Sequence, residues 1–108
     1  MSSSKEYLAF VLDQLAGLDG LSTRRMMGEY LLYYRGTLVG GIYDDRFLLK
    51  PTKSACALLR DDAGGLRTDI PYEGAREMLV ADIDDGELCR RAVRAIAEDL
   101  LAEAGGAP

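Results

Sequence analysis

The sequence contains no histidine among its 108 residues, and this absence removes several reaction classes from consideration. Ser-His-Asp and Cys-His nucleophilic catalysis both need an imidazole that titrates near neutral pH. The usual zinc sites need histidines or several cysteines, and this chain has two cysteines. We therefore expect no catalytic residues of these kinds, no metal site and no cofactor, and we do not expect an enzyme.

Cysteine is scarce, and long apolar runs are lacking. Cys56 and Cys89 each lie in an apolar, helix-like stretch, which is typical of buried thiols that pack as small hydrophobic side chains. No apolar run approaches the roughly 20 residues that cross a bilayer. The first residues show no basic segment followed by an apolar one, as an export signal would. We expect a soluble cytoplasmic protein with no disulfide and no membrane partner.

The chain does have enough apolar residues for one hydrophobic core. Hydrophobic residues make up 48% of the sequence, and a chain of 108 residues is the size of one domain. We therefore expect a single domain over residues 1–108. The formal net charge of −5 predicts an acidic surface that repels phosphate groups, so direct binding of DNA or RNA is not expected.

Hydrophobic periodicity in the first half predicts a helix followed by a meander of strands. Ser3 and Glu6 have the spacing of a capping box at the start of this helix. Apolar residues at helical spacing then run from Leu8 to Leu15. The strands that we expect are a segment around Arg25–Met27, then Tyr30–Tyr34, Thr37–Tyr43 and Arg46–Lys50, with Gly28 as a bulge or bend and with turns at Arg35–Gly36 and Asp44–Asp45.

The second half predicts a short helix, one strand and a long helix. We expect a helix capped by Thr52 and ending near Leu59, a loop over residues 61–71, and a strand over Glu77–Ala81. The final helix should be capped by Asp84 or Asp85 and should carry Leu88, Ala92, Ile96 and Leu100 on one face. The tail from Ala104 to Pro108 should fray. The order helix, meander, helix, strand, helix predicts an α+β fold of two layers, with helices packed on one face of an antiparallel sheet.

Basic, thioether and aromatic side chains meet in one short stretch of the meander, and this stretch is the candidate binding site. Two arginines beside two methionines offer orientation and apolar contact area to a partner protein. The candidate partner-binding residues are Arg24, Arg25, Met27, Gly28, Tyr30 and Tyr34. The same pattern also fits a strand with one face in the core and tyrosines packed across neighbouring strands. Tyrosines on both strand faces make a homodimer a further hypothesis.

Three glycines and one acidic run have structural explanations. Gly36 is expected in a hairpin turn, and Gly40 and Gly41 where backbones approach closely, since their spacing is not that of a phosphate-binding loop. The run Asp82–Glu87 does not fit a calcium loop, because Gly86 falls at the fifth position, where a ligand belongs. Capping of the last helix explains these acids better.

An alternative function is binding of a small molecule or an uncharacterised enzymatic activity. Glu29 and Asp44, together with Lys50, carry the groups that acid–base chemistry uses. The sequence does not fix the distances between them. A deep pocket that joins them would favour this alternative over protein binding.

The stretch Arg25–Tyr30, followed by Tyr34–Gly36 and Leu48–Lys50, resembles the N-terminal domain of the TfoX/Sxy competence-regulator family. Pro71-Tyr72 and Met78-Leu79 resemble segments from the second half of that domain. The chain departs from the family pattern at Met27, where Phe is commoner, at Glu29, where a second Gly is common, and at Val39, which replaces a frequent Phe.

The resemblance implies a two-layer fold similar to secretion chaperones and a regulatory protein without known catalytic residues. Family members in competent bacteria are similar to transcriptional co-activators that act with the cAMP receptor protein. The partner implied is therefore another protein, such as a transcription regulator. Longer members carry a second, C-terminal helical domain, and we expect no counterpart of it in these 108 residues.

Overall fold

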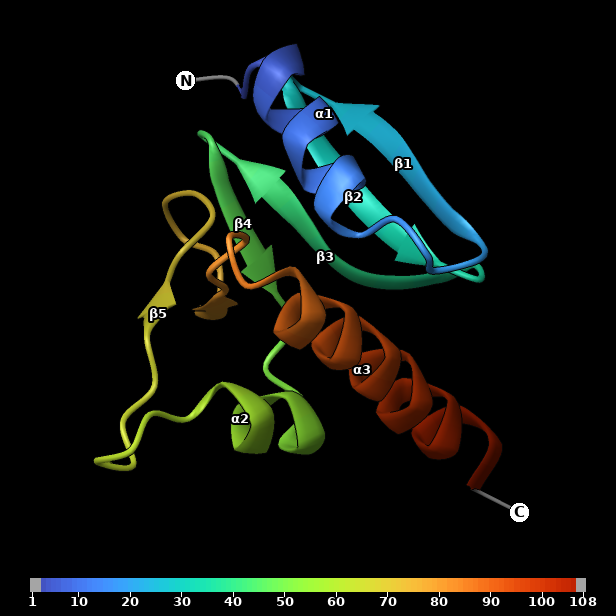
Figure 1. Cartoon of the computed structure of the whole chain (residues 1–108), viewed down its shortest axis with the longest axis vertical. Helices are drawn as coiled ribbons and strands as arrows, with labels where there is room; N and C mark the ends of the chain where they lie inside the picture. The colour runs from blue at the N-terminus through green and yellow to red at the C-terminus, as the bar shows by residue number, and fades with distance from the viewer. Residues whose placement is uncertain (1–2, 107–108) are drawn as a thin grey trace.

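The computed structural model describes residues 3–106. In that range the chain folds into a sheet with helices packed on it (Figure 1). The elements are α1 (Lys5–Gln14), β1 (Leu21–Met26), β2 (Glu29–Tyr34), β3 (Thr37–Tyr43), β4 (Arg46–Leu49), α2 (Lys53–Leu59), β5 (Thr68–Asp69), β6 (Met78–Val80) and α3 (Gly86–Gly106). The strand order is β1-β2-β3-β4-β6-β5, and every neighbouring pair is antiparallel. The predicted α+β class with one antiparallel sheet is confirmed.

One face of the sheet forms the hydrophobic core with the helices. The strand register places Tyr30, Ile42 and Phe47 side by side on this face. Val11 of α1 and Leu15, the residue that follows this helix, belong to the same core. Four buried apolar side chains of α3 also belong to it: Cys89, Ala92, Val93 and Ile96. In Figure 1, α1 lies over β2, while α3 lies beside β3 and packs against α2. The helices therefore cover one face, as the amphipathic patterns predicted.

The start of α1 differs from the prediction. The helix is capped by Ser4, whose side chain accepts a hydrogen bond from the amide of Tyr7. Ser3, predicted as the cap, is instead buried, and its hydroxyl bonds to Glu29 on β2. The capping-box prediction is wrong because a distant carboxylate competes for Ser3, which local spacing does not reveal.

Three two-residue turns join the four strands of the meander. Each turn places both of its residues at positive φ: Met27 and Gly28, Arg35 and Gly36, Asp44 and Asp45. This geometry matches the right-handed twist of the strands that it connects. The turns at Arg35–Gly36 and Asp44–Asp45 were predicted. At Gly28, where a bulge or a bend was expected, the chain reverses in a third turn that also contains Met27, a residue predicted to lie in the strand. The prediction failed there because methionine is not a usual turn residue.

The second half follows the prediction with one omission. Thr52 caps α2 and Asp85 caps α3, through side-chain bonds to the amides of Ala55 and Leu88 respectively. The predicted loop over residues 61–71 contains the short strand β5, which pairs with β6. A strand of two residues carries no detectable periodicity, so the sequence did not reveal it. The helix α3 includes Ala104 to Gly106, which we predicted to fray, and the rest of that tail lies outside the described residues.

No helix within residues 3–106 is both long enough and apolar enough to span a bilayer.

Candidate functional site

The β1–β2 hairpin projects its turn into solvent. Met27 is 94% exposed and has a φ of 52°, a left-handed conformation that methionine adopts at an energetic cost. Gly28 follows with a φ of 85°, which glycine adopts freely. Next to the turn, Met26 is 42% exposed. The hairpin therefore presents two thioether side chains to solvent and holds one of them in a strained backbone conformation.

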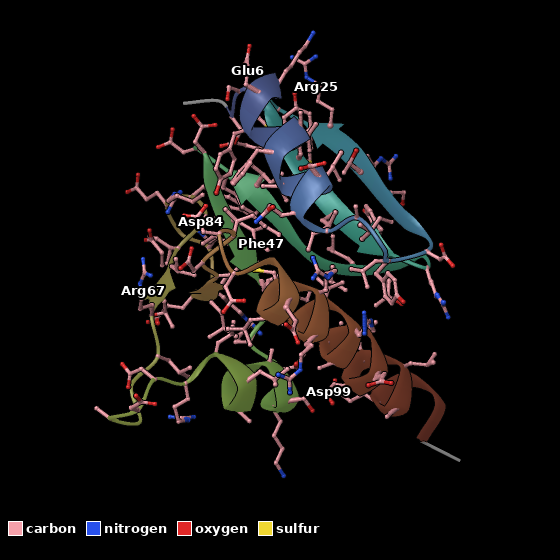
Figure 2. The ribbon with its side chains drawn as sticks, in the orientation of Figure 1. Glu6, Arg25, Phe47, Arg67, Asp84 and Asp99 are labelled. Carbon is pink, nitrogen blue, oxygen red and sulfur yellow. The ribbon has the colours of Figure 1, made fainter. Side chains whose placement is uncertain are left out.

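Arg24 and Arg25 lie on β1, and both side chains are exposed. Arg25 pairs with Tyr30 and Arg24 pairs with Leu31, so the two side chains point to opposite faces of the sheet. Within residues 3–106 the only ion pair joins Arg46 to Asp69, so neither arginine of β1 has an acidic partner there. Figure 2 shows Arg25 at the edge of the molecule, at the same end as Glu6. Two unpaired guanidinium groups thus flank this strand.

The two tyrosines of the predicted site are in the core. Tyr30 and Tyr34 are each 8% exposed, and both belong to the cluster beneath the helices. The guanidinium of Arg35 stacks over the ring of Tyr34 with its central carbon 5.3 Å from the ring centroid. Because these rings lie inside the fold, they support the hairpin and offer little contact area to a partner. Arg24, Arg25 and Met27 are therefore exposed and Gly28 is half-buried in the turn, whereas Tyr30 and Tyr34 are buried.

Gly36, Gly40 and Gly41, in the β2–β3 turn and in β3, are required by the conformation and close packing of the backbone. Gly36 has a φ of 84° in its turn. At Gly40, a Cβ atom would collide with the carbonyl oxygen of Leu48. At Gly41, it would lie 2.7 Å from the carbonyl oxygen of Tyr30. The sheet is therefore too closely packed at both positions for any side chain.

The carboxylates and the lysine of the enzymatic alternative do not converge. Glu29 accepts hydrogen bonds from the amide of Asp44 at 3.0 and 3.2 Å, so these two lie together at the β3–β4 turn. Lys50 follows the opposite end of β4. It lies five positions beyond Asp45, the last residue of that turn, which is about 16 Å of extended chain at roughly 3.3 Å per residue. Acid–base chemistry shared by the three groups is not supported by this arrangement.

A groove that sequence reasoning missed lies between the segment 71–78, the residues that follow β4 and the C-terminal part of α3. Its volume is about 830 Å³. The residues lining it include Tyr43, Lys50, Pro51, Tyr72, Met78 and Leu100. The rings of Tyr43 and Tyr72 lie 6.4 Å apart, and Tyr72 is 60% exposed. The resemblance of Pro71-Tyr72 to the family pattern was the one signal in the sequence that pointed to this segment.

The acidic run Asp82–Glu87 at the start of α3 and the buried Cys89 within that helix both have structural roles. The Asp82 side chain accepts a hydrogen bond from the amide of Asp84, and Asp85 caps the helix. In the described part of the chain no three His, Cys, Asp or Glu side chains are arranged to hold a metal ion. Burial, reinforced by Asp85 and Asp82, raises the pKa of the Cys89 thiol to about 12. Such a thiol stays protonated at neutral pH and does not act as a nucleophile.

Comparisons with known proteins identify the family. A relative from Spirochaeta aurantia, described as an uncharacterized 12.7 kDa protein in the trpE 5′ region, is 38% identical over 82 residues, which cover 76% of this chain and 68% of that protein. No solved structure matches the chain, so the similarity to secretion chaperones stays a prediction. The family described as TfoX N-terminal domain matches residues 13–79, which include the whole of the β1–β2 hairpin. The chain therefore belongs to the TfoX N-terminal domain family.

Proposed function

We propose that this chain is a small non-catalytic regulatory domain that acts by binding another protein. TfoX N-terminal domains are generally non-catalytic regulatory domains, which supports the regulatory part of the proposal. The separation of Glu29 and Asp44 from Lys50 argues in the same direction, because it leaves the one acid–base group set that the sequence suggested without a common site.

The observation that carries the proposal is the exposed end of the β1–β2 hairpin. Met27 is almost fully exposed in a strained conformation, and Arg24 and Arg25 lack acidic partners among the described residues. Neither core packing nor an ion pair within the described residues accounts for these side chains. Methionine and arginine are both enriched in the centres of protein interfaces. We refer to Arg24, Arg25, Met27 and Gly28 as the hairpin surface, and a transcription regulator is the partner class that the family favours.

Affinity capture from the native cell tests this surface. The double variant Arg24→Glu/Arg25→Glu reverses both charges of the hairpin surface, and Arg91→Glu/Arg94→Glu on α3 makes the same change of net charge at two other exposed positions. Loss of a recurrent partner with the first variant alone would support the proposal. Capture of the same proteins by both variants and the wild type would exclude the hairpin surface.

A second candidate function is binding of a small molecule in the groove. Its volume of about 830 Å³ is within the range of ligand pockets, and the exposed ring of Tyr72 next to Tyr43 offers a surface on which a flat ligand can stack. Native mass spectrometry of protein purified without denaturation tests this. A bound mass that disappears in Tyr72→Ala, with the hairpin variants unaffected, would favour the groove over the hairpin surface.

A further inference from the structure

One edge of the sheet is open along its whole length. β1 pairs with β2 through six consecutive residues without a bulge, it contains no proline, and among residues 3–106 no strand pairs with its other side. The residues Ser22 to Met26 are all exposed. Proteins usually shorten, cover, bend or interrupt such an edge, because its free backbone groups can pair with another chain. In β1 only the two arginines serve that purpose.

The register identifies the backbone groups that point outward. In a hairpin closed by a two-residue turn, the pair that flanks the turn is hydrogen-bonded and the pairs then alternate. The pairs Met26–Glu29, Arg24–Leu31 and Ser22–Tyr33 are therefore the hydrogen-bonded ones. The amide and carbonyl groups of Leu21, Thr23 and Arg25 face away from β2, so the edge offers up to about six main-chain hydrogen bonds.

The opposite edge of the sheet, formed by β5, is very short by contrast. β5 has two residues, and the guanidinium of Arg46 binds the Asp69 carboxylate at 2.6 Å and the carbonyl oxygens of Ile70 and Pro71 at 3.0 and 3.2 Å. This side chain ties the end of β5 and the segment after it to the β3–β4 turn. The β5 edge therefore offers two residues for pairing, whereas the β1 edge offers six.

Charge decides which occupant fits the open edge. Two copies paired antiparallel around Thr23 would bring four arginines together, and like charges on neighbouring strands are destabilising. Residues 21–34 carry two arginines and one glutamate, a local net charge of +1 in a chain of −5. Two cations suit two carboxylates but neutralise little of a nucleic-acid backbone. The Debye length of about 8 Å at physiological salt screens the more distant acids.

We propose that β1 binds an extended acidic segment of a partner protein as a seventh strand of the sheet. This inference rests on the proposed function and specifies the partner. Because Arg24 and Arg25 project from opposite faces, the segment should carry two neighbouring Asp or Glu residues, whose side chains alternate in the same way. Main-chain bonds to Leu21, Thr23 and Arg25 supply affinity, and the two ion pairs set the register.

Amide hydrogen exchange of the labelled protein, followed by NMR, tests the pairing directly. The probe is the synthetic peptide Thr-Val-Thr-Glu-Glu-Thr-Val-Thr, and the control peptide has Lys-Lys in place of Glu-Glu. The amides of Leu21, Thr23 and Arg25 should exchange fast in the free protein and become protected by the acidic peptide alone. The amides of Ser22 and Arg24 should be protected with and without it. Binding that leaves the three outward amides unprotected would overturn the proposal.

Variants at Thr23 separate strand addition from other modes of binding. Thr23→Pro removes one outward amide and is compatible with an edge strand, whereas Thr23→Val keeps it. With melting curves confirming the fold, the first should weaken peptide binding by about tenfold or more and the second by less than about twofold. Arg24→Glu/Arg25→Glu should prefer the Lys-Lys peptide, and Arg91→Glu/Arg94→Glu should behave as wild type.

The outcomes distinguish this inference from the proposed function. If the captured partner is lost with the arginine variant but retained by Thr23→Pro, strand addition is wrong and the interaction function stands. If light scattering shows a dimer whose formation protects the outward amides, a second copy occupies the edge and the inference is overturned. If the peptide protects those amides but capture is unchanged by every hairpin variant, the edge binds acidic strands and the proposed function fails.

Discussion

The hydroxyl of Ser3 donates a hydrogen bond to Oε1 of Glu29 at 2.7 Å, across 26 positions of the sequence. The same carboxylate accepts from the amides of Ser3 and Asp44, and the Ser3 hydroxyl in turn accepts from the amide of Asp45. Ser3 is thereby fixed to β2 and to the β3–β4 turn. This network gives a structural reason for a glutamate at a position where the family pattern commonly has glycine.

Removal of the Glu29 carboxylate should destabilise the fold. Glu29→Ala leaves the buried Ser3 without its acceptor, and loss of hydrogen bonds to a buried group costs about 1–3 kcal/mol. Urea denaturation followed by circular dichroism measures the free energy of unfolding. Glu73→Ala, at an exposed position in a turn, is the control and should change stability by less than about 0.5 kcal/mol. Equal stabilities of the two variants would show that the network contributes nothing.

Gly40→Ala should be more damaging than Gly36→Ala. The added methyl group at Gly40 meets the backbone of Leu48 and Leu49, which cannot move without distorting β4. At Gly36 the methyl group enters open space, and only the φ of 84° opposes it, at about 1–2 kcal/mol. Thermal denaturation of both variants compares them. A Gly40 variant that melts at or above the temperature of the Gly36 variant would contradict the close approach of β3 and β4.

The thiol of Cys89 should be inert in the folded protein. Its pKa of about 12 keeps it protonated, and its side chain is fully buried, whereas Cys56 is partly exposed. Iodoacetamide at pH 8 should therefore add one label, at Cys56, and two labels after denaturation. Intact mass spectrometry counts the labels, and Cys56→Ser should take up none under native conditions. Two labels on the native protein would show that Cys89 is accessible.

The same raised pKa predicts a loss of stability in alkali. The unfolded thiol ionises near its ordinary pKa of 9, while the folded one resists ionisation up to about 12. The contribution of Cys89 is therefore complete below pH 9 and is lost as the pH rises from 9 towards 12. Urea denaturation between pH 8 and 11 measures this decline. Cys89→Ala, although less stable at neutral pH, should show a shallower decline, and an identical slope would assign the effect to other groups.

Met27→Asn should stabilise the domain and weaken partner binding. Asparagine tolerates the left-handed conformation of this turn better than methionine, a gain of about 0.5–1 kcal/mol. The apolar side chain that we place in the interface is lost at the same time. Met27→Leu keeps an apolar side chain and the strain, so it should retain both the stability and the binding of the wild type. Denaturation and partner capture are measured on both variants, and undiminished capture with Met27→Asn would remove Met27 from the hairpin surface.

Local patterns predicted most of the fold but only part of the candidate site. The strands and turns from Tyr30 to Leu49 could be predicted because runs of aromatic and branched residues are separated by turn residues at short, regular intervals. The sequence left two environments open for the tyrosines, a partner surface and the core, and the structure places Tyr30 and Tyr34 in the core. A period of two shows that Tyr30 and Tyr34 share a face, but it does not show which face the helices cover.

The absence of histidine, the order of the elements and the positions of two hairpin turns were determined by the sequence alone, because composition and backbone preferences are local properties. The tertiary structure decided the rest: Ser3 reaches Glu29 and leaves the helix cap to Ser4, the tyrosines enter the core, and β1 becomes an open edge between Leu21 and Met26. These outcomes depend on which distant segments meet, since hydrogen bonds and burial are settled by partners that local spacing does not specify.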